Sequence, residues 1–141
     1  MNEVELKERT KRIALRVIKV IEALPPTKVA DVIGRQLLRS GTSVGANYRA
    51  ACRSKSLADM IAKLAIVEEE ADESIYWLEL LIESEILPAH RLLELIDELN
   101  QIVAITVSSQ KTLRGNNPSS PIQNPKSRIR DEAVEDVLRD V

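Results

Sequence analysis

Apolar residues recur every three or four positions in four stretches of the chain, and each stretch ends at a turn signal. This spacing is typical of amphipathic helices. The first predicted helix covers about residues 2–23, the second starts after Thr27, the third covers about 56–86 and the fourth about 88–113. Because the intervening turns have only a few residues, neighbouring helices must run antiparallel. The pattern predicts an all-α protein, an antiparallel up-and-down four-helix bundle.

The apolar stripes of these helices form the predicted core. Thr27 and Ser56 are the expected N-caps, and Pro25-Pro26 ends the first helix. The predicted core residues are Ile13, Val17, Val20, Ile21 and Leu24; Val29, Ile33, Leu37, Val44, Tyr48 and Ala51; Leu57, Met60, Ile61, Leu64, Val67, Ala71, Ile75, Leu78, Leu81 and Ile82; and Leu92, Ile96, Leu99 and Val103.

The last part of the chain has a different composition. Residues 115–125 are polar and contain three prolines, which favours a flexible linker between the bundle, residues 1–114, and the C-terminal residues. After this linker, Ser127 is a suitable cap for a short helix with apolar residues on one face: Ile129, Ala133, Val137, Leu138 and Val141. Such a helix is too short to be stable alone. Residues 115–141 are therefore expected to be a frayed tail or a segment that docks on a bundle or another protein.

Composition agrees with a helical core. Hydrophobic residues make up 44% of the 141 residues but aromatic residues only 2%, so aliphatic side chains must fill the interior. The single cysteine, Cys52, cannot form an internal disulfide, which favours a reducing compartment. The sequence contains neither a signal peptide nor an apolar run long enough to span a membrane. We expect a cytoplasmic protein that does not bind a membrane.

Charge is distributed unevenly, although the formal net charge is only −2. Residues 1–55 contain 12 Lys and Arg against 5 Asp and Glu, whereas residues 56–100 contain 2 against 12. Opposite charge blocks on packed helices indicate that the bundle or its assembly is partly organised by charge, although solvated faces would explain them as well.

Residue combinations for chemistry are scarce. One His and one Cys, far apart, cannot build a typical zinc site, and the Glu-rich third helix lacks the Glu-x-x-His pairs of di-iron bundles. His90 is expected on the surface and Cys52 in the core. We therefore predict no metal, cofactor, small-molecule substrate or catalytic residue, and no enzyme. Glu68 falls on the apolar stripe and needs a partner. The candidates are Arg35, Arg39, Arg49 and Arg53.

Gly41 and Gly45 lie among small residues, which favours close helix packing or a kink. The surrounding stretch, residues 38–56, contains Ser-x-x-x-Asn-Tyr-Arg ending at Arg49, and the next helix contains Glu70-Ala71-Asp72-Glu73 followed by Tyr76-Trp77-Leu78. These motifs resemble the four-helix bundle proteins encoded in intervening sequences of bacterial 23S ribosomal RNA genes. The resemblance covers about residues 5–113. It implies a homo-oligomeric ring, commonly a pentamer, without known enzymatic activity. A distant branch resembles the accessory protein of diversity-generating retroelements, which binds reverse transcriptase and nucleic acid, but this chain is acidic overall.

Two functions remain open at this stage. The chain is either an assembly or protein-binding scaffold, or an RNA-binding protein associated with ribosomal RNA or a reverse transcriptase. The same residues serve both hypotheses, either as nucleic-acid contacts or as inter-subunit contacts: Arg35, Arg39, Asn47, Arg49, Arg53, Lys55 and Lys63. In the scaffold hypothesis their acidic partners are Glu68, Glu70, Glu73 and Glu79. In the RNA hypothesis the first helix adds Lys7, Lys11, Arg12, Arg16 and Lys19.

Overall fold

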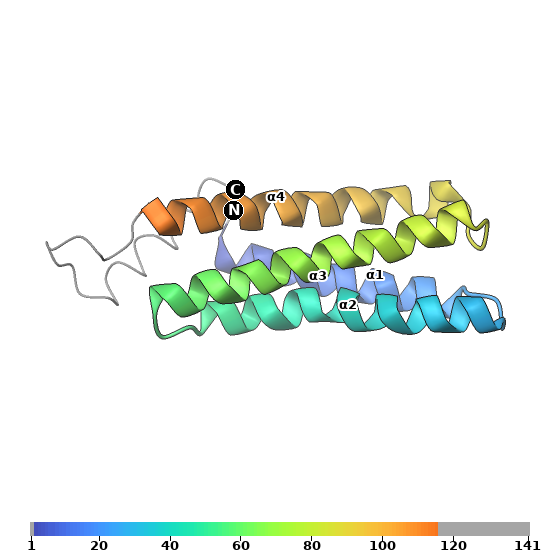
Figure 1. Ribbon diagram of the computed structural model, residues 1–141, viewed down its shortest axis with the longest axis horizontal. Coiled ribbons are helices and arrows are strands. Elements are labelled where there is room, and N and C mark those ends of the chain that lie inside the picture. The colour runs from blue at the N-terminus through green and yellow to red at the C-terminus, as the bar shows by residue number, and fades with distance from the viewer. Residues whose placement is uncertain (1, 116–141) are drawn as a thin grey trace, which may run out of the picture.

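The computed structural model describes residues 2–115 and contains four α-helices (Figure 1). They are α1 (Glu3–Glu22), α2 (Lys28–Cys52), α3 (Leu57–Glu83) and α4 (Leu93–Gly115), with a 3-10 turn, η1 (Ala89–Arg91), before α4. The predicted all-α fold is confirmed. The predicted linker and docking helix of residues 115–141 lie, apart from Gly115 at the end of α4, outside the described residues.

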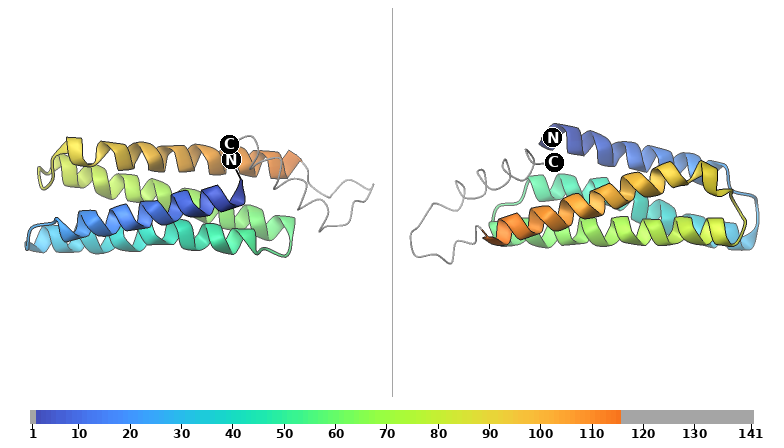
Figure 2. Two further views of the ribbon diagram at one scale, coloured as in Figure 1. Left: turned by 180° about the vertical axis from the view of Figure 1, so that it is seen from behind. Right: turned by 90° about the horizontal axis from the view of Figure 1, so that it is seen from above.

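Consecutive helices run antiparallel, as predicted. Helices α2 and α3 lie side by side, α1 packs on α2 and α4 packs on α3 (Figures 1 and 2). One end of the bundle carries the α1–α2 turn and the η1 corner. The other end carries the start of α1, the α2–α3 turn and the end of α4 (Figure 1). Features at the α1–α2 turn are therefore separated from Gly115 by almost the whole length of the bundle.

Side-chain caps begin three of the helices. Thr27 accepts a hydrogen bond from the Ala30 backbone N–H at 3.2 Å, and Ser56 accepts one from the Asp59 N–H at 3.0 Å. Both predicted N-caps are confirmed. Asn2 caps α1 in the same way, with the Glu5 N–H at 2.9 Å. Each cap satisfies a backbone donor that has no partner within its helix.

The predicted start of the fourth helix at Pro88 is wrong, because α4 begins at Leu93. Between them the chain turns more tightly. The Arg91 N–H donates to the Pro88 carbonyl at 3.1 Å, and the Leu92 N–H donates to the Ala89 carbonyl at 2.9 Å. These bonds span three residues, as in a 3-10 turn, and they bring the chain round the corner before α-helical bonding begins.

Aliphatic residues fill the core, with Tyr48 as its buried aromatic residue among those described. Most predicted core positions of α2 and α4 are buried, but a few are displaced by one position. Val29 is 58% exposed while Ala30 is buried, and on α4 Leu95 and Ile102 are buried while their neighbours Ile96 and Val103 are half-buried. In the first turns of α2 the buried positions are Ala30 and Gly34, which a search for large apolar side chains overlooks.

Candidate assembly and docking surfaces

Arg39 on α2 forms a clamp with two carboxylates of α3. Its Nη1 atom donates to Glu70 Oε2 at 3.1 Å, and its Nη2 atom donates to Glu73 Oε2. The indole Nε1 of Trp77 donates to the same Glu73 oxygen at 2.9 Å. The hydrogen bond from Trp77, and then that from Arg39, hold the pKa of Glu73 below its usual range. The clamp therefore keeps Glu73 charged and ties α2 to α3.

Beside this clamp, α2 and α3 approach closely through two buried serines. Ser74 Oγ donates to Ser40 Oγ at 2.8 Å, and both side chains are fully buried. Ser74 Oγ also lies 2.9 Å from the carbonyl oxygen of Glu70. Small hydroxyl groups that bond to each other let the two backbones approach without leaving a buried polar atom unpaired.

Helix α1 approaches α2 along a glycine seam: Gly34, Gly41 and Gly45. A Cβ atom at Gly41 would lie 2.7 Å from Val17 Cγ2, and one at Gly45 would lie 3.3 Å from the backbone carbon of Thr10. At Gly34 the nearest atom is Leu24 Cδ1, also at 2.7 Å. Of the two interpretations of the glycines, the structure shows close helix packing.

Glu68 has a different partner from the arginines proposed for it. Gln110 on α4 donates to Glu68 Oε1 at 2.8 Å, and Arg114 Nη2 lies 3.5 Å from Gln110 Oε1. The four candidate arginines belong to α2 or its end. Helix α2 packs on the side of α3 that carries Glu70 and Ser74, whereas Glu68 lies two residues from Glu70 and so projects from another side of the helix. Glu68 therefore faces α4.

Three of the other predicted site residues make local contacts. Arg35 pairs with Asp31 at 3.0 Å, and Lys63 pairs with Asp59 at 3.0 Å. Asn47 donates to the backbone carbonyl of Ser43 at 2.9 Å. Of the predicted set, the structure brings together across helices only Arg39, Glu70 and Glu73 within the described range.

Four exposed cations of the α1–α2 pair form what we call the basic edge: Lys11 near the middle of α1, and Arg49, Arg53 and Lys55 at the end of α2 and just after it. The contact between Gly45 and Thr10 places the next turn of α2, with Arg49, beside the first turns of α1. Within residues 2–115 no ion pair involves these four residues, whereas Lys7, Arg16 and Lys19 of α1 are paired with Glu3, Glu94 and Glu22.

An acidic face covers the outer side of α3 and consists of Glu69, Asp72, Glu79 and Glu83, all exposed. Tyr76 lies among them and is 53% exposed. No ion pair involves these four carboxylates in the described part of the chain. Sequence reasoning pointed to Glu79 but missed the other three, which the spacing of outward positions on α3 would have found.

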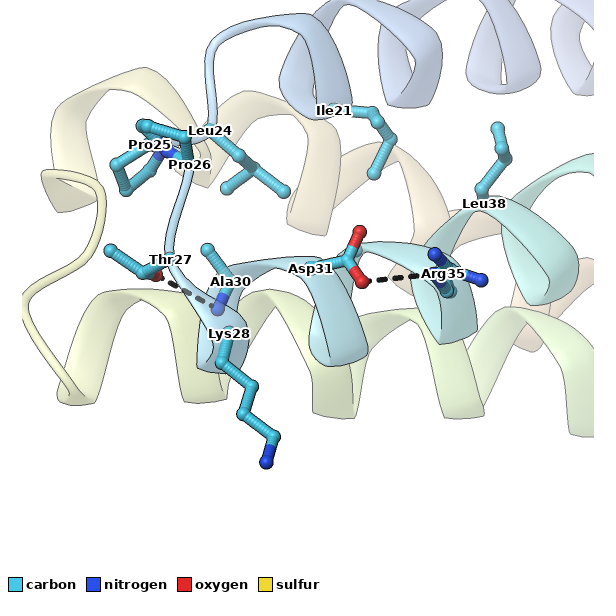
Figure 3. A pocket seen from close by; sticks show the side chains of 11 residues that line it. Ile21, Leu24, Pro25, Pro26, Thr27, Lys28, Ala30, Asp31, Arg35 and Leu38 are labelled. Carbon is cyan, nitrogen blue, oxygen red and sulfur yellow. Dashed lines mark hydrogen bonds and ion pairs between the residues drawn. The ribbon is translucent and has the colours of Figure 1, made fainter.

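A groove of about 410 Å³ lies between α1 and α2 at the end of the bundle that carries their turn, and we call it the end groove (Figure 3). Ile21 of α1 and Leu24 of the following turn form one side, Leu38 lies at one end, and Pro25 and Pro26 lie at the other (Figure 3). The remaining lining residues are Thr27, Lys28, Ala30, Asp31, Gly34 and Arg35. Leu38 is 37% exposed. Sequence reasoning missed this groove because apolar lining residues look like ordinary core.

The thiol of Cys52 is not activated for chemistry. Burial raises its pKa to about 11, so that the thiol stays protonated at neutral pH. No group of three or more His, Cys, Asp or Glu side chains within residues 2–115 could hold a metal ion. His90 is exposed, as predicted. None of the helices from α1 to α4 is both long and apolar enough to cross a membrane.

These features define a class of protein, an antiparallel four-helix bundle whose helices are joined by a glycine seam and an ionic clamp. Residues 2–108 match the family described as 23S rRNA-intervening sequence protein, and the chain belongs to this family. A similar solved structure is that of a protein with unknown function from the S23 ribosomal protein family of Bacteroides thetaiotaomicron VPI-5482. It is 36% identical, has a TM-score of 0.70, and the match covers 74% of this chain and 97% of that chain. No curated protein matches the chain.

Proposed function

We propose that the chain is the subunit of a homo-oligomer that acts as a non-enzymatic assembly or protein-binding scaffold. The observation that carries this proposal is the presence of two exposed surfaces of opposite charge, the basic edge and the acidic face, on different sides of one bundle. Neither surface has an ionic partner within the described residues. Two copies can therefore pair the basic edge of one with the acidic face of the next, a head-to-tail contact that closes into a ring when the rotation permits.

Apolar groups on the same outer surfaces support association. Tyr76 lies within the acidic face, and Leu15 on the outer side of α1 is 54% exposed. Aromatic and aliphatic residues surrounded by charges are common at protein interfaces, where burial supplies affinity and charge sets orientation. The pentamer expected from the family resemblance is one assembly that such a contact can build.

The ion pairs between helices of one subunit involve residues outside the basic edge and the acidic face. The residues that stabilise the subunit therefore differ from those proposed to stabilise the assembly. Arg39 on α2 forms ion pairs with Glu70 and Glu73 on α3, and Arg9 on α1 pairs with Glu98 on α4 at 2.6 Å. Substituting residues of the basic edge therefore leaves these ties between helices intact.

The test is the substitution Arg49→Glu, which reverses a charge in the middle of the basic edge. We expect a lower mass by multi-angle light scattering and an unchanged helical content by circular dichroism, because repulsion replaces attraction between subunits. The matched control is Arg91→Glu, which makes the same charge change at an exposed position of η1, at the opposite end of the bundle from Arg49 (Figure 1). An Arg49→Glu variant with the mass of the native protein would rule the proposal out.

Binding of RNA is the second candidate, and the same basic edge favours it. Unpaired Lys and Arg side chains on one surface can bind phosphates, and each contact adds about 0.9 to the dependence of log affinity on log salt concentration. Here Arg49→Glu should abolish RNA retention, measured by ultraviolet absorbance of the purified protein, while the oligomer mass stays constant. A native protein that carries no RNA and binds none at low salt would exclude this candidate.

A further inference from the structure

The end groove differs from a typical small-molecule site, because its polar side chains already have partners, apart from Lys28, whose side chain points away from the groove (Figure 3). Thr27 Oγ1 caps α2, and Asp31 and Arg35 pair with each other at 3.0 Å. Small-molecule sites usually contain convergent polar groups that fix a ligand. The groove instead has aliphatic and proline side chains on its α1 side and at its ends, with the carboxylate of Asp31 and the guanidinium of Arg35 on its α2 side (Figure 3). Such a groove suits apolar side chains that project from a segment carrying charges of both signs.

The chain itself contains a segment with this chemistry. Residues 127–141 carry five apolar residues at helical spacing, Ile129, Ala133, Val137, Leu138 and Val141. Their neighbours are cationic and anionic: Arg128, Arg130 and Arg139, with Asp131, Glu132, Glu135, Asp136 and Asp140. The Asp31 and Arg35 side chains are 60% and 79% exposed, so their pair can be extended by an arginine of this segment beside Asp31 and a carboxylate beside Arg35. The segment therefore complements the groove in both hydrophobicity and charge.

In the orientation that places Ser127 at the α1–α2 turn and Leu138 beside Leu38, chain length decides which copy supplies the segment. Helix α4 ends at Gly115, at the opposite end of the bundle from the α1–α2 turn (Figure 1). Its 23 residues alone span about 35 Å at 1.5 Å per residue. Residues 116–126 span at most about 36–40 Å when fully extended. In that orientation this linker would be used up along the bundle axis and could not also pass round a helix about 10 Å wide.

We propose that residues 127–141 of one copy dock in the end groove of a second copy. This inference rests on the proposed homo-oligomer and adds a second contact to it, separate from the contact between the basic edge and the acidic face. Each subunit then both gives and receives a segment, so the exchange can continue around a closed assembly. A tethered segment also gains from its high effective concentration once subunits are in contact.

The test uses full-length chains that all carry Cys52→Ser. One preparation carries Leu38→Cys in the groove, and a second, distinguishable by a tag, carries Leu138→Cys. After mixing and mild oxidation, we expect a disulfide-linked pair containing one chain of each kind. The control replaces Leu38→Cys with Val29→Cys, because Val29 is an exposed apolar residue of α2 that does not line the groove and lies nine residues from Leu38, on the opposite side of the helix.

Three results would overturn the proposal. The first is equal cross-linking of the Leu38→Cys and Val29→Cys chains, and the second is cross-linking that an excess of synthetic peptide 127–141 does not suppress. The third comes from a chain that carries both Leu38→Cys and Leu138→Cys: an internal disulfide whose yield is independent of dilution would show that the segment occupies its own groove. Light scattering on the same samples distinguishes failure of this docking from failure of the proposed homo-oligomer. An intact oligomer without the mixed disulfide contradicts only the docking of residues 127–141.

Discussion

Glu73 receives hydrogen bonds from both Arg39 and Trp77, so one carboxylate oxygen links a side chain of α2 to one on the next turn of α3. The Glu73 side chain is 34% exposed and that of Arg39 is 49% exposed. In this position water weakens the ionic attraction, and a pair of this kind contributes about 1 kcal/mol. The contribution of the clamp should therefore be measurable but modest.

The difference in stability between the native protein and the variant Glu73→Gln should depend on pH. Because the folded pKa of Glu73 lies below its unfolded value, the native carboxylate stabilises the fold fully above about pH 4.3, the usual pKa of glutamate. This stabilisation is lost as the pH falls through the lowered folded pKa. Urea unfolding followed by circular dichroism should show the native protein about 1 kcal/mol more stable than the variant at neutral pH, with the difference vanishing in acid.

Glu79→Gln is the matched control for that measurement, since Glu79 is an exposed carboxylate of the same helix without an ion pair among residues 2–115. It should show little difference at either pH. A difference between native protein and Glu73→Gln that is the same at every pH would contradict the role given to the charge of Glu73.

Single residues differ in how well the sequence predicts them. The caps Thr27 and Ser56 are predictable because a hydroxyl side chain before a helix bonds to a backbone N–H three residues away, a purely local interaction. The partner of Glu68 is not predictable in this way, because it depends on which helix packs on that side of α3. Gln110 is 42 residues away and has no charge to suggest it.

At the scale of helices, the glycine seam makes the distance between α1 and α2 shorter than side chains normally allow. The three glycine positions differ in how well they would tolerate a larger side chain. At Gly34 a new methyl group would meet the flexible end of Leu24, whereas at Gly41 it would meet both methyl groups of Val17 at 2.7 and 3.0 Å. Valine is stiff because it branches at Cβ, so it cannot easily turn away.

Gly41→Ala should therefore lower the free energy of unfolding although alanine favours helix. Overpacking costs about 1–3 kcal/mol, and the gain in helix propensity returns about 1 kcal/mol. Thermal unfolding followed by circular dichroism should give a lower midpoint. Gly115→Ala provides the control, since a Cβ there meets nothing within 4 Å, and its midpoint should stay the same or rise. Gly41→Ala with native stability would show that α1 and α2 can separate at no cost.

Helix positions follow closely from the sequence, because periodicity and prolines are visible along the chain. The start of α4 at Leu93 does not follow from the sequence, since Pro88 is compatible both with the first turn of an α-helix and with a 3-10 turn. The rotation of a helix about its own axis is also hard to predict. On α4, Leu95 and Ile96 are both large and aliphatic, and only packing against α3 decides which one is buried.

At the scale of the whole molecule, the charge asymmetry of the sequence becomes two surfaces. Part of each charge block is neutralised inside the subunit, and the rest remains as the basic edge and the acidic face. Sequence counts cannot separate these two portions, because exposure and pairing are properties of the folded bundle. The fold was thus predictable to a large extent, whereas the composition of the two surfaces was not.

Assembly through these surfaces should weaken as salt is added. The Debye length falls from about 10 Å at 0.1 M to about 3 Å at 1 M, which screens attraction between exposed charges. Multi-angle light scattering across this range should show the mass falling towards the 15.8 kDa of one chain. Circular dichroism should stay constant, because the core is aliphatic. A mass that rises or stays constant with salt would indicate association driven by apolar contacts alone.

The clamp also gives the protein a built-in optical probe. Trp77 is the only tryptophan of the chain, and its indole N–H bonds directly to the carboxylate that Arg39 holds. Its fluorescence therefore comes from a single place, the junction of α2 and α3. A change in emission wavelength reports on that junction alone, so loosening of these two helices can be followed without any label and distinguished from melting of the bundle as a whole.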